Sequence, residues 1–439
     1  MQNHPNIFKN SGIRTKVNHG ILQNKNLQAL GYALGAYLHK IDNSTVNILI
    51  GKDTRPSGIN IAYQLTQGLQ HWQHKIFDAG TVPTPCIATA LKKHTSPIFQ
   101  FGIMITASHN PAEYNGLKLI TPHGYLDLQA EEQISTYYAD YLDKELNDRP
   151  INNIVDIDLS SFYQEEVRKL IISKQFTAKK IILDCAHGAT YSLAKQIFAS
   201  YGINSIMIND SSDGSLINKE SGCSNPSLLI QALDKYNADF AFGFDGDGDR
   251  VIIVDKQHNI LDGDDLLLLL TQHPLLQNET TLVGTILTNQ AVEQQITKHK
   301  QTLIRTDVGE RNLIQALLRH NALLATEPCG HITIAPHALC SDGIFAALLL
   351  LDTLTMKKIS IKPHKFPQLH NTISLQDSTI NDAVIQSVTK QQQFEQEGRV
   401  IARKSNTEPV LRIMIEHENT DTAKALLQNL TKELMKHIN

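Results

Sequence analysis

The sequence predicts an α/β protein of several domains that ends in a smaller α+β segment. Short apolar stretches typical of buried strands alternate with amphipathic stretches typical of helices, and this alternation favours sheets with crossover helices. The chain has 439 residues, enough for about three domains of roughly 150 residues. From about Lys362 onward, strands are followed by one long amphipathic helix, which indicates a domain of a different kind.

Composition and charge exclude several classes of protein. The chain is 41% hydrophobic and 19% charged, with a formal net charge of −4 and no basic cluster, so we expect no nucleic-acid partner. The N-terminus lacks a signal-peptide core, and no window approaches about 18 uninterrupted apolar residues. We therefore expect a cytoplasmic protein with no membrane partner. The five cysteines are scattered without a CxxC pair, which argues against a disulfide framework and a structural zinc site.

The first predicted unit spans residues 1–150. Its strand at Val46–Ile50 runs into Gly51 and Lys52, which do not form a P-loop, because Val46 and Asp53 stand where that motif needs Gly and Ser or Thr. The other predicted elements of this unit are a helix at Leu27–Leu38, a helix at Ile59–Trp72, a strand at Lys75–Phe77 and a strand at Ile103–Ile105.

Two further α/β units and a C-terminal domain are predicted at residues 151–254, 255–361 and 362–439. The second unit is expected to contain helix Ser160–Ile172 and strands Ile181–Leu183, Phe240–Phe244 and Val251–Val254. The third is expected to contain helix Asp265–Leu270, strand Leu282–Leu287, helix Gln290–Lys298 and a long apolar helix from Asp342 to Leu354. The last is expected to contain strands Thr372–Leu375, Val400–Arg403 and Val410–Ile415 and helix Thr420–His437. Three comparable α/β units indicate repetition at the level of fold.

Ser108 is a candidate nucleophile. It follows the predicted strand Ile103–Ile105 in a turn-forming stretch, and ligands of open α/β sheets bind at the carboxyl ends of strands. His109 is adjacent and Lys118 follows ten residues later, so one interpretation is a hydroxyl activated by its neighbours. A polar turn without chemistry is the alternative, and a local turn hydrogen bond explains His109 as well as catalysis does.

The segment DGDGDR at residues 245–250 is the sharpest local signal. Asp245, Asp247 and Asp249 alternate with glycines, so a tightly bent backbone can direct three carboxylates at one hard cation, Mg²⁺ or Ca²⁺. An EF-hand is excluded because its twelfth position is Lys256 rather than Glu. A solvated acidic turn is the alternative, although carboxylates so close together repel one another without a cation.

Two further loops and one arginine carry candidate binding residues. The stretch from Arg403 to Pro409, with Arg412 beyond it, combines basic side chains, hydroxyls and amides in a turn between strands, which suits a phosphate. The loop at residues 327–331 offers a carboxylate and an imidazole for sugar hydroxyls, or is a structural turn. Arg14 is either an anion contact or a surface arginine.

Four motifs together resemble the α-D-phosphohexomutases over the whole chain: TASHNP at 106–111, DGDGDR at 245–250, EPCGH at 327–331 and RKSNTEP at 403–409. Within that family, GKDTRPSG (51–58), DCAHGATY (184–191) and RTDVGER (305–311) look most like the phosphoglucosamine mutase branch. The resemblance implies a heart-shaped architecture of three topologically related mixed-sheet α/β domains and a C-terminal α+β domain. In order, these would carry the phosphoserine, Mg-binding, sugar-specificity and phosphate-binding loops around a shared cleft.

The resemblance also implies a role for each matching residue. Ser108 would be the phosphoserine and would hold Mg²⁺ together with Asp245, Asp247 and Asp249. Lys118, His109 and Arg14 would assist catalysis. The implied substrate-binding residues are Arg250, Arg305, Glu327, Cys329, His331, Arg403, Ser405, Asn406, Thr407 and Arg412, of which the last five would clamp the non-reacting phosphate.

The implied reaction interconverts glucosamine 6-phosphate and glucosamine 1-phosphate. A hexosamine 1,6-bisphosphate would be both intermediate and activator, and the product would feed UDP-N-acetylglucosamine and peptidoglycan precursors. The expected partner is a small phosphosugar, and the expected assembly is a monomer or homodimer. Cys329 stands where the family usually has serine, and Pro328 where it has a polar residue or Met. A phosphomannomutase or phosphoglucomutase, and a non-catalytic sugar-phosphate binding protein, are therefore alternatives.

Overall fold

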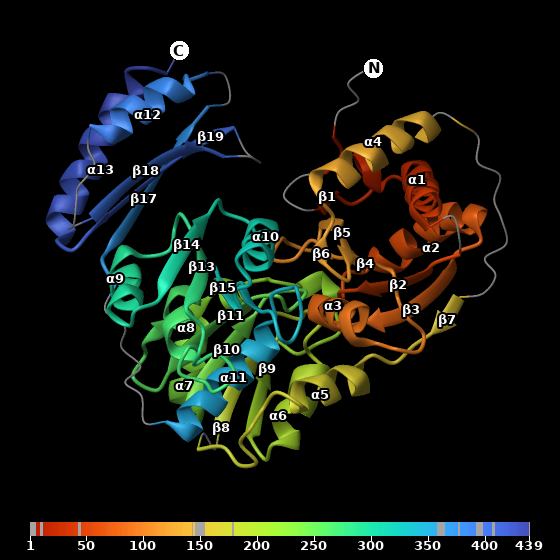
Figure 1. The fold of residues 1–439 in the computed structure, drawn as a ribbon, viewed down its shortest axis with the longest axis horizontal. Coiled ribbons are helices and arrows are strands. Elements are labelled where there is room, and N and C mark those ends of the chain that lie inside the picture. The colour runs from red at the N-terminus through yellow and green to blue at the C-terminus, as the bar shows by residue number, and fades with distance from the viewer. Residues whose placement is uncertain are drawn as a thin grey trace. The chain divides into compact units, whose positions relative to one another are not determined.

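The computed structural model describes residues 6–8, 12–42, 45–142, 144, 154–177, 180–357, 365–375, 378–391, 398–405 and 409–438. The chain divides into two compact units, one of residues 1–286 and 304–359 and the other of residues 287–303 and 360–439. Each is described by itself below, and Figure 1 gives the labels of their elements. The expected domain boundaries at residues 150 and 361 lie outside the described residues.

The first sheet of the larger unit has the strand order β1-β5-β4-β2-β3-β7, with β6 paired to β5. Strands β4, β2, β3 and the edge strand β7 are parallel, whereas β5 is antiparallel to both β4 and β1. The strands are β1 (Gly12–Lys16), β2 (Asn47–Lys52), β3 (Lys75–Thr81), β4 (Phe101–Ile105), β5 (Tyr114–Thr121), β6 (Gly124–Tyr125) and β7 (Ile154–Asp156). This mixed sheet therefore brings β5 beside the strand that precedes Ser108.

Helices cover both faces of the first sheet (Figure 1). The helices α1 (Asn24–Asp42), α2 (Gly58–Leu69) and α4 (Leu128–Leu142) share one apolar core with β2 and β4, in which Leu34, Leu65 and Ile134 meet Ile48 and Ile103. Helix α3 (Thr84–Lys93) packs on the other face, where a Cβ at Gly51 would lie 2.8 Å from Ile87. A strand buried on both faces has a continuous apolar sequence, as β4 has.

The second sheet has the order β12-β11-β10-β8-β9. Its parallel strands β8, β9 and β10 alternate with helices, and β11 returns antiparallel to β10. Residues 245–250 therefore connect two adjacent strands. The elements are β8 (Lys180–Asp184), β9 (Asn204–Ile208), β10 (Phe240–Phe244), β11 (Val251–Asp255), β12 (Ile260–Leu261), α5 (Ser160–Arg168), α6 (Leu193–Ser200) and α7 (Pro226–Tyr236). This sheet continues to Leu261, beyond the boundary expected at residue 254.

The third sheet has the order β14-β13-β15-β16. Its strands and adjoining helices are β13 (Thr281–Thr285), β14 (Thr302–Thr306), β15 (Leu324–Thr326), β16 (Ile332–Ile334), α8 (Gly263–Leu270), α10 (Glu310–His320) and α11 (Gly343–Met356). Asp262 caps α8 in a reciprocal capping box with Asp265. Helix α11 is apolar on nearly every side and buried over residues 343–353, as expected for a helix in the middle of a large core.

Helix α5 ends at Arg168, four residues before the predicted end at Ile172. The physical reason is a buried carboxylate on α11. The amides of Ile172 and Ser173 leave the helix and donate to Asp352, at 2.7 and 3.0 Å. A tertiary contact has therefore replaced the last helical turn. Strand β13 also ends at Thr285 rather than at the predicted Leu287.

The smaller unit contains helix α9 (Gln290–Lys298) and a three-stranded antiparallel sheet of order β17-β19-β18. Its other elements are β17 (Gln368–Ser374), α12 (Asp382–Lys390), β18 (Gly398–Lys404), β19 (Val410–His417) and α13 (Thr420–Met435). Leu430 and Leu434 of α13 are buried against Leu411, Ile413 and Ile415 of β19. The predicted amphipathic C-terminal helix is thus confirmed, with its end two residues before His437.

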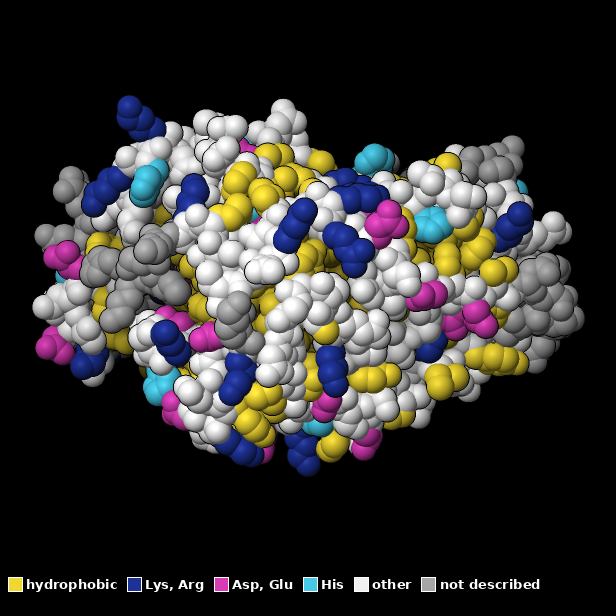
Figure 2. Space-filling view, turned by 90° about the horizontal axis from the view of Figure 1, so that it is seen from below, with side chains coloured by type: hydrophobic (Ala, Val, Ile, Leu, Met, Phe, Trp, Pro, Cys, Tyr) yellow, Lys and Arg dark blue, Asp and Glu magenta, His cyan; other side chains and the backbone are white. Residues whose placement is uncertain are grey.

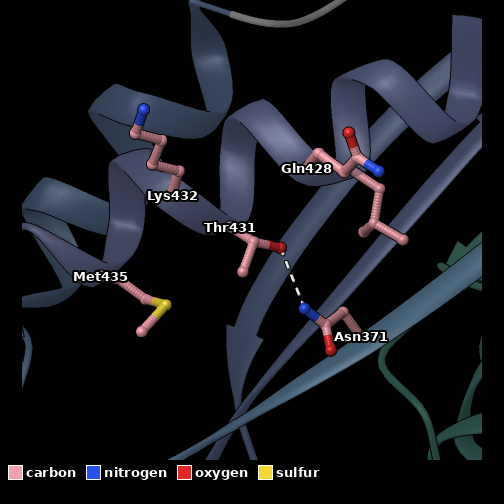
Figure 3. Close-up of a pocket in the computed structure, with 6 residues that line it drawn as sticks. Asn371, Gln428, Thr431, Lys432 and Met435 are labelled. Carbon is pink, nitrogen blue, oxygen red and sulfur yellow. Dashed lines mark hydrogen bonds between the residues drawn. The ribbon is translucent and has the colours of Figure 1, made fainter.

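A pocket of about 460 Å³ lies between α13 and β17 in this smaller unit (Figure 3). The amide of Asn371 donates to Thr431 Oγ1 at 3.0 Å across it, and Leu427, Gln428, Lys432 and Met435 complete its lining. The described lining residues include none of the predicted site residues. On the face shown in Figure 2, Lys and Arg side chains are spread out, with Asp and Glu between several of them. No helix among the described residues has both the length and the apolar run needed to cross a bilayer.

Candidate active site

The serine loop, residues 106–111, follows the buried strand β4. Ser108 is 1% exposed, and its backbone is in the left-handed region with φ 51°. Its Oγ donates a hydrogen bond to Asp245 Oδ2 at 2.7 Å, and His109 Nδ1 lies 3.4 Å from the same Oγ. The structure therefore brings the candidate nucleophile directly onto the first of the three aspartates.

The aspartate loop, residues 245–250, connects β10 to β11, and all three of its carboxylates are buried. Asp245 Oδ1 accepts the amides of Gly248 and Arg250, at 3.1 and 3.2 Å, which holds the loop in a tight turn. A Cβ at Gly246 would lie 2.7 Å from the carbonyl oxygen of Ser108. Only glycine permits this close approach, so the sequence pattern itself sets the distance between the two loops.

Lys118 provides the cation of this cluster. The register of β4 and β5 places it opposite Met104, and its Nζ donates to Asp247 Oδ2 at 2.6 Å and also to Asp249 Oδ2. Desolvation would lower the pKa of Lys118, but the carboxylates of Asp247 and Asp249 outweigh it and raise the pKa above the ordinary value. Lys118 is therefore an ammonium ion that offsets the negative charge of the two carboxylates.

Two carboxylate oxygens of the aspartate loop have no partner within the described part of the chain. These are Oδ1 of Asp247 and Oδ1 of Asp249. Ligand oxygens of Asp245, Asp247 and Asp249 all lie within 4.8 Å of one another, and burial, with the charges of Asp249 and Asp247, raises the pKa of Asp245. Buried carboxylate oxygens without donors are costly unless a cation binds them. The residues present fit a hard divalent cation such as Mg²⁺.

His331 lies beside this cluster and supplies a proton donor. Arg250 Nε donates to His331 Nε2 at 2.9 Å, so in the neutral ring the proton lies on Nδ1. Burial, together with Arg250 and Lys118, lowers the pKa of His331 well below its ordinary value and keeps the ring neutral. Nδ1 lies 3.8 Å from Asp249 Oδ1 and 3.9 Å from Glu310 Oε2. Because a protonated nitrogen cannot bind a metal, His331 is a poorer metal ligand here than the aspartates.

The loop at residues 327–331 joins β15 to β16. Glu327 is 4% exposed and its Oε1 accepts the amide of Gly309 at 2.6 Å. Cys329 Sγ donates to Glu327 Oε2 at 3.5 Å. Burial raises the pKa of Glu327, although the Gly309 amide and the charge of Arg250 oppose the rise. The loop thus presents a fixed acceptor and a weak sulfur donor side by side.

Arg14 and Arg305 lie in different surroundings. Arg14 is on β1, and its Nη1 donates to Asn110 Oδ1 of the serine loop at 3.1 Å. Arg305 is on β14, where its Nη1 donates to the carbonyl of Thr285 at 3.0 Å. It lines a separate hollow of about 210 Å³ that also contains Asp307 and Arg319. Arg14 is therefore hydrogen-bonded to the serine loop. The contacts described for Arg305 are with Thr285 and with the residues of the separate hollow.

The predicted phosphate-binding residues lie in the smaller unit. The register of β18 and β19 pairs Arg403 directly with Arg412, and directly opposed residues project from the same face of a sheet. The Ser405 amide donates to the Val410 carbonyl at 2.9 Å, which closes the end of this hairpin. Asn406 and Thr407 lie outside the described residues.

Two residues of the site were not found by sequence reasoning. Thr84, at the start of α3, donates from its hydroxyl to Asp247 Oδ2. Glu310, at the start of α10, accepts from the hydroxyl of Tyr125 at 2.6 Å and lies among Asp249, Lys118 and His331. Glu310 is within the RTDVGER motif, which could have drawn attention to it, whereas Thr84 had no local signal.

Comparison with known proteins gives a consistent result along the chain. Four family models match, described as Phosphoglucomutase/phosphomannomutase alpha/beta/alpha domain I at residues 5–144, domain II at 161–259, domain III at 262–365 and C-terminal domain at 381–433. The matched regions together cover well over half of the chain and include every predicted site loop.

Individual proteins agree with the family models. A phosphoglucosamine mutase of Alkaliphilus oremlandii is 31% identical over 455 residues, covering 99% of each chain. A crystal structure of a phosphoglucomutase/phosphomannomutase family protein from Burkholderia thailandensis superposes with a TM-score of 0.84 at 21% identity, covering 98% of this chain and 97% of the other. The N-acetylphosphoglucosamine mutase of Aspergillus fumigatus, solved with GlcNAc-6P and magnesium, superposes with a TM-score of 0.63 at 16% identity, covering 97% and 95%. The chain therefore belongs to the phosphoglucomutase/phosphomannomutase family, the α-D-phosphohexomutases, and is an isomerase of that family most like phosphoglucosamine mutase.

Proposed function

We propose that this protein is a phosphoglucosamine mutase that interconverts glucosamine 6-phosphate and glucosamine 1-phosphate through a phosphorylated Ser108. The observation that supports it best is the 2.7 Å hydrogen bond from Ser108 Oγ to Asp245, in a loop that also holds two carboxylate oxygens with no hydrogen bond from any described residue. A hydroxyl that carries phosphate beside a cation site is what phosphoryl transfer requires.

The proposed reaction consists of two transfers. In the first, a sugar hydroxyl attacks the phosphorus, the bond from phosphorus to Ser108 Oγ breaks, and a hexosamine 1,6-bisphosphate forms. The bisphosphate then turns over, and its other phosphate returns to Ser108. In each transfer one hydroxyl loses a proton and another regains one. Neutral His109, with Nδ1 3.4 Å from Ser108 Oγ, is in position to pass that proton.

Charge is balanced by the residues around Ser108. Mg²⁺ held by Asp245, Asp247, Asp249 and a phosphoserine oxygen would neutralise charge on the transferring phosphoryl group. The Lys118 ammonium, which contacts Asp247 and Asp249, and the Arg14 guanidinium add positive charge on the protein side. These groups act mainly by electrostatic stabilisation, which dominates the catalysis of phosphoryl transfer.

Substrate binding is proposed to use two sets of residues. Glu327, with Cys329 beside it and His331 Nδ1–H, would bind sugar hydroxyls, and Arg250 and Arg305 would add positive charge for a phosphate. Arg403, Ser405, Asn406, Thr407 and Arg412 would hold the non-reacting phosphate. The paired Arg403 and Arg412 support this role, because two neighbouring guanidinium groups suit a dianion. We further infer that the product feeds UDP-N-acetylglucosamine synthesis in the cytoplasm.

The decisive test of substrate is the rate of mutase turnover on glucosamine, glucose and mannose 6-phosphates with Mg²⁺ and a trace of the matching 1,6-bisphosphate. We expect kcat/KM to be highest on glucosamine 6-phosphate and to vanish in Ser108→Ala. An equal or higher kcat/KM on mannose or glucose 6-phosphate would identify a phosphomannomutase or phosphoglucomutase instead. Binding of all three without turnover would favour a non-catalytic sugar-phosphate binding protein.

A further inference from the structure

Ser108 has a backbone conformation that needs outside support. Its φ of 51° lies in the left-handed region, which residues other than glycine adopt at a cost of about 1 to 3 kcal/mol. Such a conformation persists only where surrounding contacts fix it. The side-chain contacts that fix the carbonyl of Ser108 come from two residues to which the proposed mechanism assigns no role.

Arg55 is the first of these residues. It is only 2% exposed, and its guanidinium donates to the main-chain carbonyl of Ser108 and to carbonyls that follow Ser108 in the chain. Nη2 donates to the carbonyls of Ser108 and Asn110, at 3.0 and 2.6 Å. Nη1 donates to the carbonyl of Tyr114 at 2.8 Å and to that of Pro111. One planar group therefore holds four carbonyls of the turn.

The charge of Arg55 is balanced within the same network. Its Nε donates to Asp53 Oδ2 at 2.9 Å, and that oxygen also accepts from the hydroxyl of Thr106 at 2.6 Å. Thr106 Oγ1 in turn accepts the amide of Ser108 at 2.8 Å. The amide and the carbonyl of Ser108 are thus both held by one connected set of hydrogen bonds that begins at the end of β2.

Asn218 is the second residue, and it connects the serine loop to the sheet that carries the aspartates. Its Nδ2 donates to the carbonyls of Ser108 and Asn110, at 2.8 and 2.9 Å, the same two that Arg55 Nη2 contacts. The backbone N–H of Asn218 donates to the carbonyl of Ala186, which follows β8, at 2.9 Å. Asn218 therefore fixes the serine loop relative to the second sheet, whose strand β10 leads into Asp245.

We propose that Arg55 and Asn218 are positioning residues that hold Ser108 Oγ at the distance from Asp245 needed for phosphoryl transfer. This inference rests on the proposed role of Ser108 as the phosphate carrier. The geometry requires a guanidinium at position 55, since a lysine ammonium cannot reach four carbonyls from one plane. At position 218 it requires a side-chain amide on a left-handed backbone, where φ is 59°.

The test compares Arg55→Lys and Asn218→Gly with the wild type. Asn218→Gly removes the amide donor but adopts the left-handed backbone without strain, so it keeps the test valid if Arg55→Lys does not fold. The matched control is Arg311→Lys, which weakens the ion pair of a half-buried arginine with the buried carboxylate of Glu131 on α4. Each protein is phosphorylated with glucose 1,6-bisphosphate and mixed with glucosamine 6-phosphate, and the single-turnover transfer rate is measured by rapid quench. The ³¹P NMR shift of the phosphoserine and the melting temperature are recorded in parallel.

We expect transfer to slow by about 100-fold in Arg55→Lys and about 10-fold in Asn218→Gly, because misplacement by about 1 Å costs that order of rate. The KM for glucosamine 6-phosphate should be unchanged and the ³¹P shift should move. Arg311→Lys should change only the melting temperature. Wild-type transfer rates and ³¹P shifts in a folded Arg55→Lys or Asn218→Gly protein would overturn the inference. A wild-type protein that never carries phosphate would instead overturn the proposed function.

Discussion

Two clusters of buried carboxylate in the larger unit differ in how their oxygens are partnered. In the Asp352 cluster, Oδ2 accepts from His273 Nε2 at 3.0 Å and from the Ile172 amide, and Oδ1 accepts from the Ser173 amide. Both side chains of the His273–Asp352 pair are fully buried. In the aspartate loop the carboxylates are equally buried, yet Asp247 and Asp249 each keep one oxygen to which no described residue donates a hydrogen bond.

We interpret the Asp352 cluster as one that stabilises the fold and the aspartate loop as one suited to a cation. A buried carboxylate with every oxygen bonded contributes to folding, and removal of one partner leaves a costly buried charge. Three neighbouring carboxylates with open oxygens repel one another and are stabilised when a cation binds. Substitutions in the two clusters should therefore have opposite consequences for activity and for stability.

The largest effect is expected from Asp247→Asn. Loss of one cation ligand should lower kcat by about 1000-fold, or about 4 kcal/mol of transition-state stabilisation. The free energy of unfolding without metal should change by less than about 1 kcal/mol, because Lys118 keeps its contact with Asp249 and one like-charge repulsion disappears. Steady-state kinetics and urea unfolding measure the two quantities. A variant that retains wild-type kcat would remove Asp247 from the proposed cation site.

The reverse pattern is expected from Asp352→Asn. The buried pair with His273 and one charge-assisted amide contact are lost, so the free energy of unfolding should fall by about 3 kcal/mol, with kcat within about twofold of wild type. Burial would raise the pKa of Asp352, but the hydrogen bonds from His273 and the two amides lower it. The contribution of Asp352 to the free energy of unfolding should therefore be complete above the ordinary carboxyl pKa of about 4. It should disappear as the pH falls through the lower pKa of the folded state. This pH dependence should be absent in Asp352→Asn.

Addition of Mg²⁺ should also distinguish the clusters. At about 100 times its dissociation constant, a ligand specific for the folded state adds about 2.7 kcal/mol of stability. We expect an increment of this order in the wild type and in Asp352→Asn, and none in Asp247→Asn, by thermal unfolding with and without EDTA. An equal increment in all three proteins would show that Mg²⁺ binds elsewhere.

The smallest effect concerns His109. Desolvation by the surrounding protein, with the charges of Arg250 and Arg14, lowers its pKa to about 3. Because the unfolded chain binds this proton near pH 6.5, the folded state should lose stability as the pH falls from about 6.5 toward 3. His109→Gln should reduce that loss, and NMR should show a neutral His109 ring at pH 5. A ring that titrates near pH 6.5 would contradict the assignment of a neutral His109.

The sequence predicted those parts of the site that depend on local pattern. Ser108 and the aspartate loop follow short apolar runs with turn residues beyond them, so their positions at strand ends could be read directly. Arg55 and Glu310 lie within the motifs GKDTRPSG and RTDVGER, whereas Thr84 and Asn218 have no local signal. The contacts of all four could not be predicted, because they come from tertiary packing between elements far apart in sequence. The charge of Lys118 is evident from the sequence, but its contacts with Asp247 and Asp249 depend on its place on β5.

Strand β5 was itself not predicted. Its sequence YNGLKLIT contains Asn and Gly, which are rare in strands, although Asn115 and Gly116 are buried between β1 and β4. A Cβ at Gly116 would lie 2.0 Å from the carbonyl oxygen of Ile13. Gly116 lowers the strand propensity of this sequence, and it is also the residue that lets β1 and β5 approach each other. The half-exposed strand β9 was missed for a related reason, since an edge strand has a weaker apolar signal.

The most direct test of a phosphorylated Ser108 is peptide-resolved mass spectrometry of the protein after incubation with glucosamine 1,6-bisphosphate and Mg²⁺, followed by a chase with glucosamine 6-phosphate. We expect one phosphoryl group on Ser108 that disappears during the chase as bisphosphate is formed, without release of inorganic phosphate. Absence of phosphate on Ser108, or its loss only as inorganic phosphate, would contradict the proposed mutase mechanism.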